Sequence, residues 1–234
     1  MQQVLFQDLG LKAYKEVWDY QECLLKDSVE IKMKNRELDE SQLPLPSKHH
    51  LLFVEHPPVY TLGKSGNEEN ILISEQELFQ KSIEYFHINR GGDITFHGPE
   101  QLVGYPILDL DCFKTDLGWY LRSIEDVIIN TMADYGIVGG RSAGETGVWI
   151  DADIKGRERK ICAIGIKCSR WVTMHGFAFN VNTDLSYFGN IVPCGIVNKQ
   201  VTSLQKELGR TIDMKDVKKK VKHYFEEIFQ VKLV

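Results

Sequence analysis

The chain has 234 residues, of which 43% are hydrophobic and 26% are charged, as in an ordinary globular protein. Its 28 basic and 33 acidic residues leave a formal net charge of −5, which disfavours non-specific binding to nucleic acid or anionic lipid. No stretch approaches the roughly 18 apolar residues that a membrane span needs, and the N-terminal MQQVLFQDLG lacks the pattern of a secretory signal. We therefore expect a soluble cytoplasmic protein without a membrane or nucleic-acid partner.

The five cysteines are scattered along the chain and form no Cys-x-x-Cys pair: Cys23, Cys112, Cys162, Cys168 and Cys194. An odd, dispersed set argues against a disulfide framework and against structural zinc. We expect no metal, and one of these thiols could be a nucleophile.

The N-terminal half predicts one long helix followed by strands. Apolar residues recur every three or four positions from Leu11 to about Arg36, which indicates an amphipathic helix. The apolar run from Leu51 to Val54 reads as a buried strand, and residues 85–89 alternate like a second one. Gly91 and Gly92 then end that strand with a turn.

The C-terminal half predicts two helices around an antiparallel meander. A helix is expected from about Asp116 to Asp134, followed by strands over residues 147–150, 160–167 and 171–181, and a final helix over residues 217–228. No linker or repeat divides the chain. We predict an α/β (α+β) fold in one domain, residues 1–234, with a mixed, largely antiparallel sheet flanked by helices.

A nucleotide-binding phosphate loop is not expected. Gly63, Lys64 and Ser65 imitate the end of such a loop, but Pro58 stands where its first glycine belongs. The G-x-G-x-x-G pattern is also absent.

Three segments could carry chemistry. RGGDITFHGPEQ, residues 90–101, could present backbone N–H groups together with Arg90 and His97, although such a loop can also be a simple hairpin turn. HGFA, residues 175–178, could line an apolar slot or be an ordinary core strand. Cys194 lies between Pro193 and Gly195, a setting that can hold a thiol at a turn near N–H donors.

A thiol with a pKa of about 8.5 needs a base or a cation nearby to act at neutral pH. His97, His175 and several lysines are candidates, and a Cys–His hydrolase pairing remains open at this point.

Six motifs in order resemble the lipoyl(octanoyl) transferase family: EHPPVYTLGKSG, RGGDITFHGP, GVWI, KICAIGIK, HGFAFNVNTDL and PCGI. The resemblance extends from Gln7 to about Gly209. It implies a fold similar to the catalytic domain of biotin and lipoate protein ligases. It also implies transfer of an octanoyl group from octanoyl-acyl carrier protein to a lysine of lipoyl domains in oxoacid dehydrogenases or the glycine cleavage H protein, with no cofactor.

The resemblance also assigns site residues. It makes Cys194 the acyl carrier and Lys160 the residue that tunes it. The implied substrate residues are Arg90, Gly91, Gly92, Asp93, Ile94, Thr95, Phe96 and His97, then Ala163, Ile164 and Gly165, then His175, Gly176, Phe177 and Ala178. Thioester exchange followed by amide formation needs no ATP. Lys160 could serve as a cation beside the thiolate or, as a neutral amine, as a proton acceptor.

Two positions depart from the family pattern. Glu100 replaces the second glycine of the usual HGPGQ, and Lys64 replaces the arginine of LGRSG. We expect Glu100 to face the mouth of the site and solvent. The alternatives are an ATP-dependent lipoate ligase, a silent protein that only docks lipoyl domains, and a cysteine hydrolase that releases free octanoate.

Overall fold

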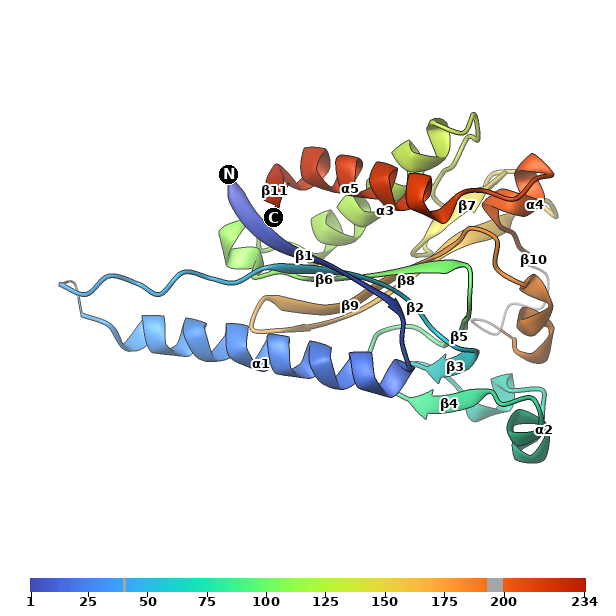
Figure 1. Cartoon of the computed structure of the whole chain (residues 1–234), viewed down its shortest axis with the longest axis horizontal. Coiled ribbons are helices and arrows are strands. Elements are labelled where there is room, and N and C mark those ends of the chain that lie inside the picture. The colour runs from blue at the N-terminus through green and yellow to red at the C-terminus, as the bar shows by residue number, and fades with distance from the viewer. Residues whose placement is uncertain (40, 193–199) are drawn as a thin grey trace.

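The computed structural model describes residues 1–39, 41–192 and 200–234. Its main sheet is mixed (Figure 1). The strand order is β10 (Gln200–Val201), β8 (Arg159–Ser169), β9 (Val172–Asn180), β6 (Gln101–Ile107), β2 (His50–Glu55), β1 (Gln2–Leu11) and β11 (Val231–Leu233), with β7 (Val148–Ile150) also paired to β8. The central pairs from β8 to β2 are antiparallel, whereas β1 runs parallel to both of its neighbours.

A smaller sheet lies beside the first and brings the glycine-rich segment into place. It has the order β4 (Glu84–His87), β3 (Val59–Leu62) and β5 (Ile94–His97). The short helices η1 (Glu68–Asn70) and α2 (Glu75–Gln80) precede β4. Because β4 runs parallel and β5 antiparallel to β3, the link between them, residues 88–93, passes from one side of β3 to the other. Within this link, the N–H of Gly91 donates to the carbonyl of Ile166 in β8 of the main sheet.

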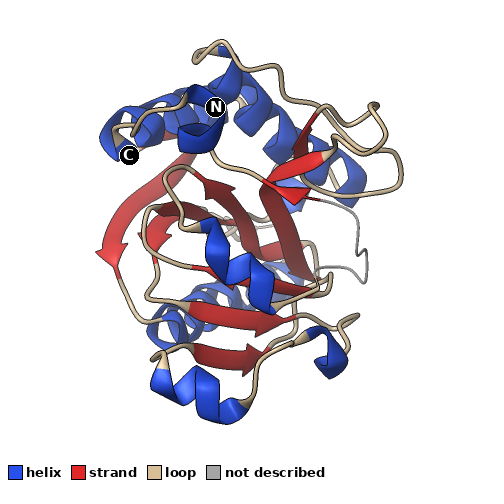
Figure 2. Cartoon of the chain, turned by 90° about the vertical axis from the view of Figure 1, so that its right-hand side faces the viewer, coloured by secondary structure: helices blue, strands red, loops and turns tan. Residues whose placement is uncertain are grey.

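Helices cover both faces of the main sheet, as Figure 2 shows. α1 (Tyr14–Glu37) packs on one face through Val17, Leu24 and Leu25, which are buried against β2, β6 and β9. α3 (Leu117–Ala133) and α5 (Met214–Phe229) pack together on the opposite face. Three shorter helices, η2 (Leu110–Cys112), η3 (Leu185–Asn190) and α4 (Leu204–Leu208), complete the connections.

Local sequence explains where these helices begin. The side chain of Asp116 accepts a hydrogen bond from the backbone N–H of Trp119, and that of Asp213 accepts one from Lys215, so each caps a helix whose first amides lack partners. The apolar stripe of α5, Val217, Val221 and Phe225, is buried on the core, while Lys215 and Lys219 are exposed.

The predicted fold class is confirmed, and the predicted helices and strands appear within a few residues of their expected ends. The antiparallel meander is β7, β8 and β9. The sequence analysis missed the strands β1, β3, β5, β6, β10 and β11. Within the described residues, no helix is long and apolar enough to cross a membrane.

Candidate active site

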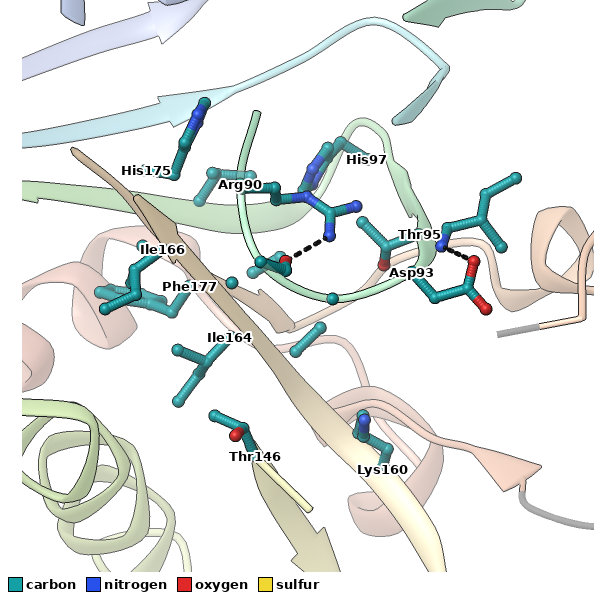
Figure 3. Close-up of a pocket in the computed structure, with 18 of the residues that line it drawn as sticks. Arg90, Asp93, Thr95, His97, Thr146, Lys160, Ile164, Ile166, His175 and Phe177 are labelled. Atoms are coloured by element: carbon teal, nitrogen blue, oxygen red, sulfur yellow. Dashed lines mark hydrogen bonds between the residues drawn. The ribbon is translucent and has the colours of Figure 1, made fainter. Parts of the chain in front are cut away.

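A cavity of about 440 Å³ lies where residues 90–97 cross the edge of β8 (Figure 3). β8 runs between two groups of lining residues: Arg90 and His97 lie on one side, and Thr146 and Ile164 lie on the other. The cavity therefore extends along both faces of the sheet around the edge of this strand.

On the face that α1 covers, four small residues line the cavity. Ala163 pairs with Ala178 across β8 and β9, and Gly165 pairs with Gly176. Directly paired residues are neighbours, so these four positions form one small-residue floor. Its two glycines admit neighbouring backbone, since a Cβ on Gly176 would lie 2.2 Å from the Gly104 carbonyl oxygen. Tyr14, a residue of α1, lines the same cavity.

The Arg90–Asp93 segment closes this space from the edge. The backbone N–H of Gly91 donates to the carbonyl of Ile166 at 2.8 Å. A Cβ atom on Gly165 would lie 2.8 Å from the Gly91 carbonyl oxygen and 3.0 Å from Cδ of Arg90. Glycine at position 165 therefore permits the close approach of the two backbones.

Arg90 and Asp93 hold this segment to the smaller sheet. A guanidinium nitrogen of Arg90, Nη2, donates to the backbone oxygen of Thr61 at 2.6 Å and to its hydroxyl at 3.0 Å. The carboxylate of Asp93 accepts from the amide of Asn70 at 2.6 Å. These contacts give both charged residues a role in fixing the loop, where the sequence suggested only that Arg90 contacts substrate.

An edge position of β8 faces the cavity. The carbonyl of Ile166 accepts from the N–H of Gly91, whereas the N–H of its partner on β9, His175, donates to Gln21 instead. The Ile166 carbonyl therefore points away from β9, and alternate residues of a strand direct their N–H and C=O groups to the same side. Ile164 lies two residues before Ile166 and lines the cavity, so its backbone groups also point toward the edge.

The histidines of the cavity are neutral in this setting. Burial lowers the pKa of His97 to about 3, with a further contribution from the neighbouring His56. Burial also lowers the pKa of His175 to about 3, assisted by Arg90 and Lys167. At neutral pH both rings are uncharged, and neither has the pKa near 7 that suits a general base.

Lys160 borders the cavity near the start of β8. Its ammonium nitrogen lies 4.5 Å from the ring centroid of Trp149, within the range of a cation–π contact. The residues that bring Trp149 there are GVWI, one of the motifs singled out in the sequence.

Cys194 lies outside the described residues. On either side of the 193–199 segment, Phe188 and Val201 both line the cavity. Two of the described thiols are poor candidates as nucleophiles, because burial raises the pKa values of Cys162 and Cys168 and favours the protonated form.

Lys160 and the predicted substrate residues line the cavity with a single exception, Phe96. The Phe96 side chain is buried, and its ring stacks on Tyr187 with centroids 4.6 Å apart. Alternation along β5 explains this, since Phe96 and its neighbour His97 face opposite sides.

Sequence reasoning missed lining residues from other elements. They are Tyr14, Gln101, Val103, Tyr105, Leu121, Gly144, Glu145, Thr146, Ile166, Asn180, Phe188 and Val201. Gln101 ends the RGGDITFHGPEQ segment and could have been included. Tyr14 and Leu121 belong to helix stripes that read as core packing, so local sequence held no signal for them.

The fold places the protein in a class with known enzymes. A lipoate protein ligase from Thermoplasma acidophilum superposes with a TM-score of 0.71 at 14% identity, covering all of this chain and 86% of that one. A biotin protein ligase from Aquifex aeolicus gives a TM-score of 0.53 at 14% identity, covering 97% of this chain and 70% of that one. The architecture is thus that of the lipoate and biotin ligases.

The sequence narrows this class to a family. Residues 13–226 match the model of the lipoyl protein ligase A/B catalytic domain, and the chain belongs to that family. A relative from Christiangramia forsetii named octanoyltransferase is 55% identical over 232 residues, covering 99% of this chain and 97% of the relative.

Proposed function

We propose that this chain is an acyltransferase that moves an octanoyl group from octanoyl-acyl carrier protein to a lysine of a lipoyl domain, through a thioester on Cys194. One observation carries the proposal: the small-residue floor lies beside a loop whose backbone is held in place. The floor consists of Ala163, Gly165, Gly176 and Ala178. The names of relatives that match nearly the whole chain support the same reaction.

The small-residue floor suits an acyl chain. A flexible alkyl chain gains free energy by leaving water, at about 25 cal/mol per Å² of buried apolar surface. It needs a trough without bulky side chains, and the paired glycines and alanines line the cavity without any. We assign the octanoyl tail to this trough, beneath Tyr14 and beside the Arg90–His97 segment.

The chemistry takes place at the edge of β8. The Cys194 thiolate attacks the thioester carbonyl, and the carrier thiol leaves with a proton that the Lys160 ammonium gives up. The lysine amine of the lipoyl domain then attacks the Cys194 thioester, an amide forms, and the thiolate is released again. The Ile164 N–H, directed to this edge, can donate to the oxygen on which negative charge develops.

Lys160 supports both half-reactions. As an ammonium it stabilises the thiolate of Cys194 and so raises the reactive fraction of that thiol. Since His97 and His175 are neutral and weakly basic, Lys160, left as a neutral amine once it has given its proton to the carrier thiol, is also our candidate for the group that accepts a proton from the attacking amine. The expected acceptors are the lipoyl domains of oxoacid dehydrogenases and of the glycine cleavage H protein, in the cytoplasm.

The test uses the whole chain with octanoyl-acyl carrier protein and an apo lipoyl domain, without ATP. Intact mass spectrometry should show one hydroxylamine-labile octanoyl adduct on the enzyme and a stable one on the lipoyl domain. Cys194→Ala should abolish both, whereas Cys162→Ala, at a buried thiol, should abolish neither. An adduct that persists in Cys194→Ala would contradict the proposal, and ATP-dependent transfer with AMP release would favour a ligase.

A further inference from the structure

A buried carboxylate on α3 has no part in the reaction described above. Glu125 is fully buried, although acidic side chains are rarely so unless they are paired. Its Oε2 accepts from Arg122 at 2.6 Å and from Arg141 at 2.7 Å, and its Oε1 accepts from the backbone N–H of Gly147 at 3.0 Å.

These bonds fix both ends of one loop. Arg141 and Gly147 bound the segment that contributes Gly144, Glu145 and Thr146 to the cavity wall. Before it, Gly140 and Trp149 exchange backbone hydrogen bonds of 2.8 and 2.9 Å. Two sets of contacts therefore close the loop. The Gly140–Trp149 backbone hydrogen bonds join its two ends, and the Glu125 carboxylate joins Arg141 to Gly147.

Gly147 connects this loop to Lys160. Its φ of +117° is a conformation that L side chains rarely adopt, and a Cβ there would lie 2.5 Å from the Cys162 carbonyl oxygen and 3.6 Å from Cε of Lys160. The Gly147 backbone thus lies directly against the Lys160 side chain. Two residues later, Trp149 places its ring under the Lys160 ammonium.

We propose that Glu125 is a positioning residue for Lys160: by holding the Gly147 N–H, it fixes the Gly147–Trp149 backbone against which the Lys160 side chain lies. The proposal rests on the function assigned to Lys160. It does not require Glu125 to touch substrate. A carboxylate is suited to this task because it accepts from an amide and two guanidinium groups at once.

The neighbouring residue offers a matched control. Asp126 also accepts from Arg141, but it is half-exposed, and the Gly147 N–H donates to Glu125. Glu125→Gln and Asp126→Asn each remove one negative charge beside Arg141, and the glutamine offers a single oxygen where two guanidinium groups and the Gly147 N–H now share two. A general effect of lost charge appears in both variants, whereas loss of Lys160 positioning appears only in the first.

The position of Lys160 can be measured without catalysis. Reductive methylation with ¹³C-formaldehyde labels lysine amines and keeps their charge, and the Lys160 signal is assigned by its absence in Lys160→Arg. The Trp149 ring should shift this signal upfield in the wild type and in Asp126→Asn. We expect Glu125→Gln to lose most of that shift and to transfer octanoyl groups at least about tenfold more slowly, with an unchanged KM for the lipoyl domain.

Glu125→Asp separates position from charge, because it keeps the carboxylate but withdraws it from Gly147 by one methylene. We expect it to behave like Glu125→Gln. If Glu125→Gln does not fold, this variant and Arg141→Met, at a partly exposed residue, provide the same readout. A wild-type Lys160 shift in folded Glu125 variants would overturn the inference. Full activity in Lys160→Met would instead refute the function assigned to Lys160, while the shift would still report on Glu125.

Discussion

The Nδ1 atom of His97 lies 2.9 Å from Oε1 of Gln101, and the surrounding contacts determine which of the two is the donor. The Gln101 amide nitrogen donates to the Phe96 carbonyl at 3.1 Å and to Oδ1 of Asn180 at 2.9 Å. Its oxygen is therefore the acceptor, and His97 carries its proton on Nδ1. The other ring nitrogen, Nε2, is left as a neutral acceptor.

The chain of hydrogen bonds continues to the strand that follows Cys194. The Asn180 amide nitrogen donates to the carbonyl of Thr202 at 3.0 Å, and the Thr202 N–H donates to Lys160. The polar network thus links the loop that contains His97 with β10 and the start of β8. Because the side chains of this network are uncharged, another group must accept the proton of the attacking amine. Lys160 is therefore the residue to test.

Lys160→Arg should separate the two tasks of this lysine. Arginine can keep a cation over Trp149, but it cannot lose its proton in a protein. We expect Cys194 to remain reactive toward iodoacetamide, while octanoyl transfer falls at least about a hundredfold, the lower range for loss of a general acid–base group. Octanoylated Cys194 should accumulate and be visible by intact mass. Near-normal transfer would show that charge alone suffices.

Ala163→Val should shorten the acyl chain that the enzyme accepts. A β-branched side chain fits a strand, so the sheet should persist while the added methyl groups occupy the trough above Ala178. We expect kcat/KM for octanoyl-acyl carrier protein to fall about tenfold, equivalent to about 1.4 kcal/mol of barrier, and that for the butanoyl thioester to fall less. Ile161→Val, at a core residue of β8 that does not line the cavity, is the control. An equal loss for both chain lengths would argue against the trough.

The sequence predicted elements whose pattern is local and strong. The apolar stripe of α1 was readable because it buries one face of the helix, and β8 and β9 were readable as strand-like segments separated by turns. β1 was not recognised, because it alternates poorly and obtains its place from parallel pairing with β2 and β11, which are far away in the chain. β10 has two residues, too few to show any period.

The residues of the candidate site also fall into those that local sequence indicates and those that only the fold reveals. Glycines and small residues mark the substrate segments in the sequence, since a close approach such as that of Gly165 to Gly91 leaves no alternative. Glu125 contacts Arg141 and Gly147, which are 16 and 22 residues away, and nothing in its local sequence distinguishes it from an ordinary polar residue. Gln101 lies in a segment that the sequence singled out, but its contact with Asn180 joins residues 79 positions apart. Both contacts emerge only from the folded chain.

Acid should destabilise the fold before the carboxylates titrate. Burial lowers the pKa values of His56, His97 and His175 to about 4, 3 and 3, respectively, below the value of about 6.5 in the unfolded chain. Between pH 6.5 and 4 the unfolded state therefore binds protons that the native state does not, so the free energy of unfolding falls as pH falls. Each histidine contributes up to about 1.4 kcal/mol per pH unit.

Urea unfolding at pH 7.0, 6.0 and 5.0 measures this dependence. His97→Gln should be less stable than the wild type at pH 7 and should show a smaller slope between pH 6 and 5, by about one proton. The same free energy of unfolding at pH 6.5 and pH 5 would show that these histidines are not held neutral in the native state.

Glu100, where the family pattern has glycine, should tolerate reversion. Its φ is +59°, which costs a side chain roughly 1 kcal/mol. Its carboxylate lies on the exposed side of the turn and accepts from Asn182 at 2.6 Å, a bond worth about 1 kcal/mol; Glu100 does not line the cavity. Glu100→Gly removes both the backbone strain and the hydrogen bond, so we expect a change in stability within about 1 kcal/mol and transfer activity within about threefold.

Glu100→Ala keeps the positive φ but loses the bond, and should be less stable than Glu100→Gly by roughly 1 kcal/mol. Denaturant midpoints of the three proteins give the order directly. A Gly variant with transfer changed more than tenfold would place Glu100 at the reaction, against its position in the structure.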